Sequence, residues 1–339
     1  MAIDLSTLDQ THRLLFEIPL KPLQGQRFQP TGFPGLGAAT FETADGACLL
    51  VESAQSMANR LELMAWDDAA QDVTPALQGI SHVRVNRPDQ SFLTDTIIEA
   101  HRLNSPYLLE ESSKKFFQQL QAELGVMETG SINRRKLAEV LLKYDIGSLL
   151  HGVFLAKKDL AGGRLRVARA LTAFIEADGV QVAASGGVKN DHVNPSWPKA
   201  KVEKGFGNVP FARDEFTATH CTLYVNLDLA QIRGYGLDAP VQRLLVLLAL
   251  YKLRALVDGG LRLRTSCDLA VVTDHITAVA PAGFALPSLT DITQDLRQAI
   301  SQCAEHMTVT KAVFADKIEV KKGADDEPEA TPEAEQAED

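Results

Sequence analysis

Apolar residues recur at helical spacing directly after a short apolar run that ends at Val51. They form one stripe at positions i, i+3, i+4, i+7 and i+11, made of Ala54, Met57, Ala58, Leu61 and Ala65. This spacing predicts an amphipathic helix that packs one side inward. Its polar residues lie on other faces, with Ser53, Ser56 and Arg60 together and Gln55 and Asn59 flanking them. Free N–H groups and the helix dipole attract anions at such a start, so a phosphate contact stands beside the simpler interpretation of a cap and a solvated face.

The same reasoning predicts a mixture of strands and helices along the chain. Apolar runs predict strands over residues 14–20, 146–155, 222–229 and 261–272, and at the start of 165–177. Helical spacing predicts helices over residues 114–124, 134–144, 240–257 and 289–303. The third helix is apolar almost all round, so we expect it to be buried. This order of elements permits an α+β fold of the ferredoxin-like (RRM-like) type.

Two segments interrupt the pattern. Residues 67–113 lack sustained periodicity and contain turn signals such as Arg87-Pro88-Asp89, which indicates an insertion. Residues 185–213 are rich in Gly and Pro and carry five basic side chains. Because apolar segments flank it on both sides, this second segment is predicted to form a projecting hairpin or arm.

The formal net charge of −10 is concentrated at the end of the chain. Residues 324–339 carry eight acidic side chains and no Lys or Arg, whereas residues 157–264 hold 16 basic against 10 acidic residues. A basic middle and an acidic tail can accompany nucleic-acid binding. The composition of the tail is typical of disorder.

Composition also bears on location and chemistry. The longest apolar run, residues 244–251, is too short to span a bilayer, and the N-terminus has no signal-peptide pattern. Four scattered cysteines are typical of a reducing compartment, so we expect a cytoplasmic protein with no membrane partner. The chain has no zinc, nucleotide or hydrolase motif, and we therefore expect neither a metal nor a cofactor.

Arginines provide the candidates for contacts with RNA phosphates. Those that the sequence context favours are Arg27, Arg164, Arg166, Arg169, Arg262 and Arg264. The three at 164–169 can follow a strand edge, although a solvated edge accounts for them equally well. Arg262 and Arg264 alternate with apolar residues and should therefore share one face of a strand. That face of the sheet would offer arginines in place of the paired aromatic residues of a typical RRM.

Six short motifs follow one another along the chain. They are LKPLQG at 20–25, FQPTGFP at 28–34, Ser53-x-Gln55-Ser56-x-x-x-Arg60, LLHGVF at 149–154, SGGVKND at 185–191 and LRLRT at 261–265. In this order and spacing they resemble the backbone subunits of CRISPR Cascade complexes, and they are most similar to the type I-G (formerly I-U) subunit of the RAMP superfamily. The resemblance rests on the set of motifs, since none of them is specific alone.

The resemblance implies a domain organisation. A ferredoxin-like (RRM-like) palm would comprise residues 1–66, 136–184 and 214–322. Residues 67–135 would be a finger insertion and residues 185–213 the thumb arm. Residues 323–339 would remain a disordered acidic tail.

The resemblance also implies a function. The chain would be a non-catalytic subunit that polymerises along CRISPR RNA, holds its sugar-phosphate backbone and presents it for pairing with target DNA in antiviral defence. Its partners would be CRISPR RNA, the target DNA strand, further copies of itself and other Cascade subunits. In the thumb, Lys189 and Trp197, with Val193 and Phe206, would contact phosphate or act as a wedge. Trp197 could equally anchor the arm onto its own palm.

Enzymatic alternatives rest on few residues. Type III relatives cut RNA with an aspartate, and Asp145 and Asp191 lie at suggestive positions, but the resemblance here is to type I, so we expect no cleavage. An RNA-processing endoribonuclease of the same superfamily would use His151, in an apolar segment where a core role is more common, or His192 beside Asp191. A metabolic enzyme with an unrecognised site is the remaining alternative.

Overall fold

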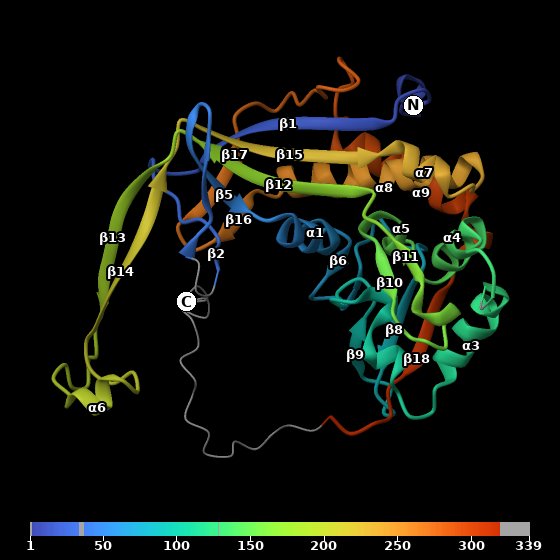
Figure 1. Cartoon of the computed structure of the whole chain (residues 1–339), viewed down its shortest axis with the longest axis horizontal. Coiled ribbons are helices and arrows are strands. Elements are labelled where there is room, and N and C mark those ends of the chain that lie inside the picture. The colour runs from blue at the N-terminus through green and yellow to red at the C-terminus, as the bar shows by residue number, and fades with distance from the viewer. Residues whose placement is uncertain (1, 34–36, 128, 319–339) are drawn as a thin grey trace.

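The computed structural model describes residues 2–33, 37–127 and 129–318 (Figure 1). Its largest element is a seven-stranded antiparallel sheet in the order β16-β17-β1-β15-β12-β5-β4. The strands of this sheet are β1 (Arg13–Pro22), β4 (Thr40–Thr43), β5 (Gly46–Glu52), β12 (Leu171–Asp178), β15 (His220–Asp228), β16 (Leu261–Arg264) and β17 (Cys267–Val271).

Four adjacent strands have the order of a ferredoxin-like fold. Helix α1 (Ala54–Leu63) lies on the connection from β1 to β12, and α8 (Ala239–Asp258) lies on the connection from β15 to the β16–β17 hairpin. Taken along the chain, the spatial order β17-β1-β15-β12 is fourth, first, third, second, as in a βαββαβ unit. The α+β fold class is therefore confirmed, and its strand order is compatible with a ferredoxin-like palm.

The period of two along the strands explains how the sheet builds the core. In β1, Leu14, Phe16, Ile18 and Leu20 are buried, whereas the residues between them are more exposed. Helix α1 packs against β12 and α8, and α8 also contacts α9 (Leu289–Gln302) and the short α7 (Leu229–Gly234). Neighbours on several sides account for a helix that is apolar almost all round.

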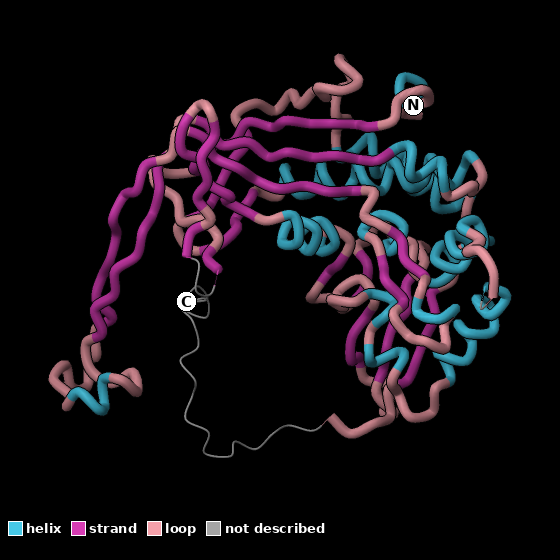
Figure 2. Tube along the Cα trace, in the orientation of Figure 1, coloured by secondary structure: helices cyan, strands magenta, loops and turns pink. Residues whose placement is uncertain are grey.

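A smaller lobe packs beside the end of the large sheet (Figures 1 and 2). It contains a three-stranded sheet of β8 (His82–Asn86), β9 (Phe92–Asp95) and β18 (Val309–Val313), with α2 (Pro106–Leu109), α3 (Lys115–Leu124) and α4 (Arg134–Tyr144). The hairpin of β6 (Trp66–Asp67) and β7 (Asp72–Val73) leads into it. The resemblance places residues 214–322 in the palm, whereas within this range β18 pairs parallel with β8 of the smaller lobe. Pairing between such distant segments leaves no local signal in the sequence.

The predicted strand over residues 146–155 is wrong. The structure forms α5 (Gly147–His151) and then the short β10 (Val153–Leu155), which pairs with β11 (Leu165–Val167). Gly152 separates the two elements at φ +78°, a conformation that favours glycine. A short apolar run does not distinguish a buried strand from a buried helix, which explains the error.

A long hairpin projects from the large sheet (Figures 1 and 2). It consists of β13 (Gln181–Lys189) and β14 (Val209–Thr217), which continue β12 and β15 and carry α6 (Lys199–Val202) near the tip. Residues 185–213 lie in this hairpin, which we call the arm. At its base lies the small pair β2 (Gly32–Phe33) and β3 (Gly37–Ala38). None of the helices in the described residues is long and apolar enough to cross a membrane.

Candidate nucleic-acid interface

An arginine-lined cleft of about 1130 Å³ lies between the end of the large sheet and the smaller lobe. Six arginines line it, namely Arg13, Arg102, Arg134, Arg164, Arg166 and Arg169. The only acidic residue in the described lining is Asp228. The arginines come from the start of β1, the turn before α2, the start of α4, and β11 with the segments on either side of it. We call this feature the arginine cleft.

The arginines of the cleft differ in how they are held. Arg13 forms an ion pair with Asp228, and Arg164 donates to the backbone carbonyls of Ala161 (2.9 Å) and Gly130 (3.1 Å). The side chains of Arg134 and Arg166 are exposed. A cleft with this excess of positive charge and dispersed donors suits a polyanion such as a nucleic-acid backbone.

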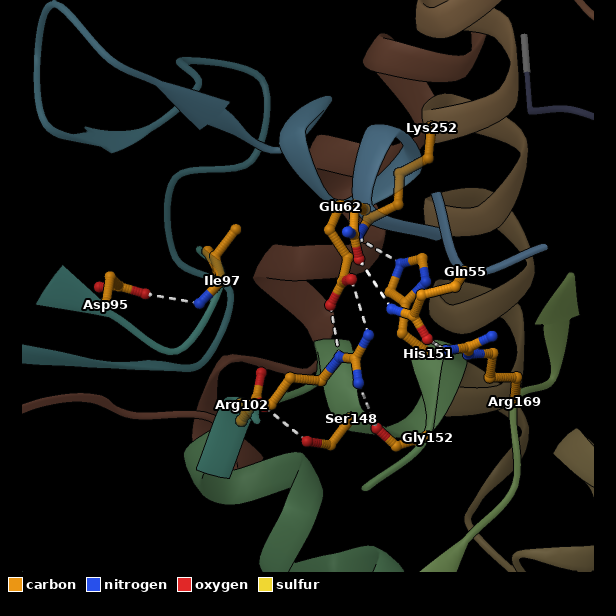
Figure 3. A network of polar contacts seen from close by, with 12 residues as sticks. Gln55, Glu62, Asp95, Ile97, Arg102, Ser148, His151, Gly152, Arg169 and Lys252 are labelled. Carbon is orange, nitrogen blue, oxygen red and sulfur yellow. Dashed lines mark hydrogen bonds and ion pairs between the residues drawn. The ribbon is translucent and has the colours of Figure 1, made fainter. Parts of the chain in front are cut away.

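Helix α1 connects to the cleft through two amides (Figure 3). The Gln55 Nε2 group donates to Asn59 Oδ1 at 3.0 Å, and Arg169 donates to Gln55 Oε1. Ser53 caps the helix as predicted, because its hydroxyl accepts from the Ser56 N–H at 3.2 Å. The structure thus brings together the predicted candidates Gln55, Asn59 and Arg169, which lie far apart in the sequence.

Arg60 and Arg264 are engaged inside the protein. Both form ion pairs with Glu52, whose side chain is 1% exposed, and the Arg60 Nε–Glu52 Oε1 distance is 2.9 Å. Arg60 also donates to the Leu263 carbonyl at 2.6 Å, and the Ser56 hydroxyl donates to Glu52. Desolvation by burial lowers the pKa of both arginines. This arrangement fastens the β5–α1 junction to β16, a role that the sequence analysis did not consider.

The face of the sheet differs from the expectation. Arg262 is exposed on β16 but Arg264 is largely covered, and a register shift separates the two. Both arginines alternate with the buried Leu261 and Leu263 as predicted, and Arg264 is covered because it pairs with Glu52. The sheet instead carries an aromatic pair, since the rings of Phe174 and Tyr224 stack with centroids 5.1 Å apart. The expected absence of paired aromatic residues is therefore wrong.

The remaining candidates lie on the arm or beside its base, away from the arginine cleft. Arg27 and Arg213 approach Glu215 at the base of the arm, with N–O distances of 3.7 and 3.0 Å. Lys189 is exposed at the end of β13. Trp197 donates its indole N–H to Asp191 Oδ2 at 3.1 Å.

The tip of the arm is organised around Asp191. Its carboxylate accepts the backbone N–H groups of Asn194 at 3.1 Å and of Gly207 and Val193 at 2.8 Å, and these bonds lower its pKa. Trp197 packs against Phe206 with ring centroids 5.1 Å apart, so it anchors the tip to itself and not to the palm. Val193 is 91% exposed at the same tip.

The groups considered for catalysis are placed very differently. Asp145 and His151 are buried, and His192 is exposed on the arm. Desolvation raises the pKa of Asp145 to about 6, and its carboxylate accepts from the Ser148 hydroxyl at 2.5 Å. Desolvation and the neighbouring Lys252 lower the pKa of His151 well below its ordinary value, so it is neutral. Among the described residues, no group of three or more His, Cys, Asp or Glu side chains could hold a metal ion.

Sequence reasoning missed half of the cleft. Arg13, Arg102 and Arg134 were not among the candidates, although each lines it. Arg102 lies in the segment without periodicity, where the sequence carries no signal of its role. It forms a two-point ion pair with Glu62 of α1 and donates to the Gly152 carbonyl at 3.1 Å (Figure 3).

Comparison with known proteins relates the chain to a CRISPR-associated family. Residues 14–182 match the family model described as CRISPR-associated protein GSU0053. The chain is similar to a CRISPR-associated family. The matched segment contains β1 except for Arg13, α1, the smaller lobe except β18, and the five cleft arginines that follow Arg13.

Solved structures and curated protein sequences provide two further comparisons for the chain. A solved structure titled "CRISPR RNA-guided surveillance complex, pre-nicking" is 16% identical, with a TM-score of 0.37, and the alignment covers 76% of this chain and 73% of that one. No curated protein sequence matches the chain.

Proposed function

We propose that the chain is a non-catalytic backbone subunit of a type I CRISPR effector (Cascade) complex, of type I-G. In this proposal it polymerises along CRISPR RNA, holds the RNA backbone and presents the bases to a target DNA strand in the cytoplasm. The match of residues 14–182 to a CRISPR-associated family supports the setting. The observation that carries the RNA-holding role is the convergence of six arginines in one cleft.

The chemistry of the cleft supports backbone binding without base selection. Guanidinium groups bind phosphate oxygens at two points, and they carry no information about sequence when they contact only phosphates. The amides of Gln55 and Asn59 lie next to Arg169 and would extend the polar track onto α1. A subunit that accepts any guide sequence needs this kind of contact, because the base edges must stay free to pair.

The arm and the adjoining subunits complete the proposal. The arm projects from the palm (Figure 1). Its tip carries the exposed Val193 and the packed pair of Trp197 and Phe206. An exposed apolar residue at the tip, with the exposed Lys189, Lys199, Lys201 and Lys204 near it, suits contact with RNA and with the next copy of the chain. Other Cascade subunits would bind the ends of the resulting filament.

Charge removal in the cleft tests the proposal. The double variant Arg134→Gln/Arg166→Gln removes two of the exposed arginines of the cleft. If both contact phosphate, affinity for single-stranded RNA should fall for every sequence alike. The slope of log affinity against log salt should become shallower by about 1.4, because each phosphate contact contributes about 0.7 for a single strand.

Arg135→Gln is the matched control. Arg135 is adjacent in sequence and carries the same charge, but it pairs with Glu139 and Asp238 outside the cleft. We expect its salt slope to remain that of the wild type. Equal effects of the double variant and the control, or no effect of either, would contradict RNA holding by the cleft.

A further inference from the structure

A buried pair of basic side chains lies behind the arginine cleft. The Lys252 Nζ group of α8 and the His151 Nε2 atom of α5 are 2.8 Å apart, and both residues are at most 3% exposed (Figure 3). An ammonium group has donors and no acceptor, so Nε2 must accept this hydrogen bond. A neutral imidazole carries one proton, and the proton of His151 is therefore on Nδ1.

This arrangement leaves the Nδ1–H donor of His151 unpaired among the described residues. The Nδ1 atom of His151 is buried and meets no hydrogen-bond partner among the described residues. Buried N–H groups are normally paired, and one that stays unpaired destabilises the structure that contains it. The Lys252 contact fixes the tautomer, so the ring cannot relieve the problem by moving its proton to Nε2.

The surroundings of the ring indicate which acceptor would satisfy it. His151 lines the arginine cleft together with Arg102 and Arg169, whose charges both act on the imidazole. Arg102 is already paired with Glu62, whereas Arg169 contacts a neutral amide, that of Gln55. An acceptor that enters here meets positive charge on its other sides, so an anionic oxygen is favoured over a neutral carbonyl.

We propose that His151 donates its Nδ1–H to a phosphate oxygen of RNA bound in the arginine cleft, beside Arg169. This inference rests on the proposed function and adds one fixed phosphate position to it. The Nδ1 atom is enclosed, so the contact includes a small rearrangement of the cleft wall when RNA binds. The neutral imidazole offers one directional hydrogen bond and no charge, so it would fix the position of one phosphate. The flexible arginines around it can bind a phosphate over a range of positions.

Free phosphate could also accept the Nδ1–H hydrogen bond of His151. NMR of the imidazole ring distinguishes free phosphate from RNA as the acceptor. We would label the full chain with ¹⁵N-histidine and record the two imidazole nitrogens of His151, assigned with the His151→Asn variant. In the free protein the proton should be on Nδ1. Addition of single-stranded RNA should shift the Nδ1 nitrogen and its proton, whereas inorganic phosphate alone should not. An Nδ1 signal unchanged by saturating RNA, or moved by inorganic phosphate and not by RNA, would overturn the proposal.

Two variants give the energetic test. His151→Phe removes the donor, and His151→Asn keeps an N–H close to the Nδ1 position. We expect RNA affinity to fall about tenfold or more in the Phe variant, as for a hydrogen bond to a charged group, and to recover in part in the Asn variant. The salt slope should not change, because a neutral donor releases no counterion.

The outcomes separate this inference from the proposed function. Full RNA affinity in a folded His151→Phe variant overturns the phosphate contact, while a weakened Arg134→Gln/Arg166→Gln variant would still support RNA holding by the cleft. Equal losses in His151→Phe and His151→Asn would mean that the ring acts through packing, which also overturns it. Should the Phe variant not fold, the NMR experiment on the wild-type chain decides alone.

Discussion

The ion pairs of Glu52 provide a test of which arginines are structural. Glu52 is 1% exposed and lies between Arg60 and Arg264, and it also accepts from the Ser56 hydroxyl. The variant Glu52→Gln keeps the size of the side chain and removes its charge. It leaves two partly buried guanidinium groups to share one neutral amide.

The size of the effect follows from the burial of the partners. Removal of one partner of a buried ion pair destabilises a protein by about 3–5 kcal/mol. Here Arg60 and Arg264 are 26% and 13% exposed, and each keeps a backbone carbonyl acceptor, on Leu263 and Gln29. The side-chain amide of the Glu52→Gln variant can also still accept a hydrogen bond through its oxygen. We therefore expect the free energy of unfolding to fall by about 2–3 kcal/mol.

Urea unfolding followed by tryptophan fluorescence measures this loss, since Trp66 is buried in the folded chain. The matched control is Glu42→Gln on β4, where the side chain is exposed, and its effect should stay within about 0.5 kcal/mol. A stability of Glu52→Gln equal to that of the control would refute the structural assignment of Arg60 and Arg264. It would return both arginines to the set of phosphate contacts.

Four further outcomes are expected. Gln55→Ala should weaken RNA binding without a large loss of stability, to be compared by titration and urea unfolding, because its contacts lie on the exposed side of α1. Burial lowers the pKa of Lys252 from 10.5 to about 8, so protonation of Lys252 opposes folding. The free energy of unfolding of the wild type should therefore increase with pH between about 8 and 10.5. Unfolding curves of Lys252→Met across this pH range should not show that increase. Truncation after Gly323 removes an acidic segment and should leave guide binding intact, and loss of assembly in sedimentation would show that the tail binds a partner. The pure chain should cut neither RNA nor DNA with or without divalent metal, and cleavage lost in Asp191→Ala would contradict this.

Local patterns predicted much of the fold. Helices α4, α8 and α9 lie within a residue or two of their predicted bounds because each has a long apolar stripe or surface, and Asn133 and Ser288 cap α4 and α9. The pairing of β18 with β8 joins segments more than 220 residues apart, and no local periodicity encodes it. The α5 helix was mistaken for a strand because its apolar run is too short to show a period.

The candidate site was predictable only in part, for a related reason. Ser53 matches the N-cap pattern at the start of α1, and the predicted candidates Gln55, Arg166 and Arg169 lie at or beside the cleft. Whether an arginine faces solvent or a buried carboxylate depends on a partner far along the chain. Arg264 meets Glu52 across more than 200 residues, and nothing near either residue reveals it.

RNA crosslinking on the intact assembly tests the central claim most directly. The full chain would be purified from cells that express a CRISPR array containing photoreactive uridine, irradiated, and analysed by mass spectrometry of the crosslinked peptides. The account predicts RNA of uniform length, with crosslinks on the peptides that carry Arg134 and Arg166 and on the start of α1. Absence of RNA, or crosslinks confined to the sheet face around Phe174 and Tyr224, would contradict it.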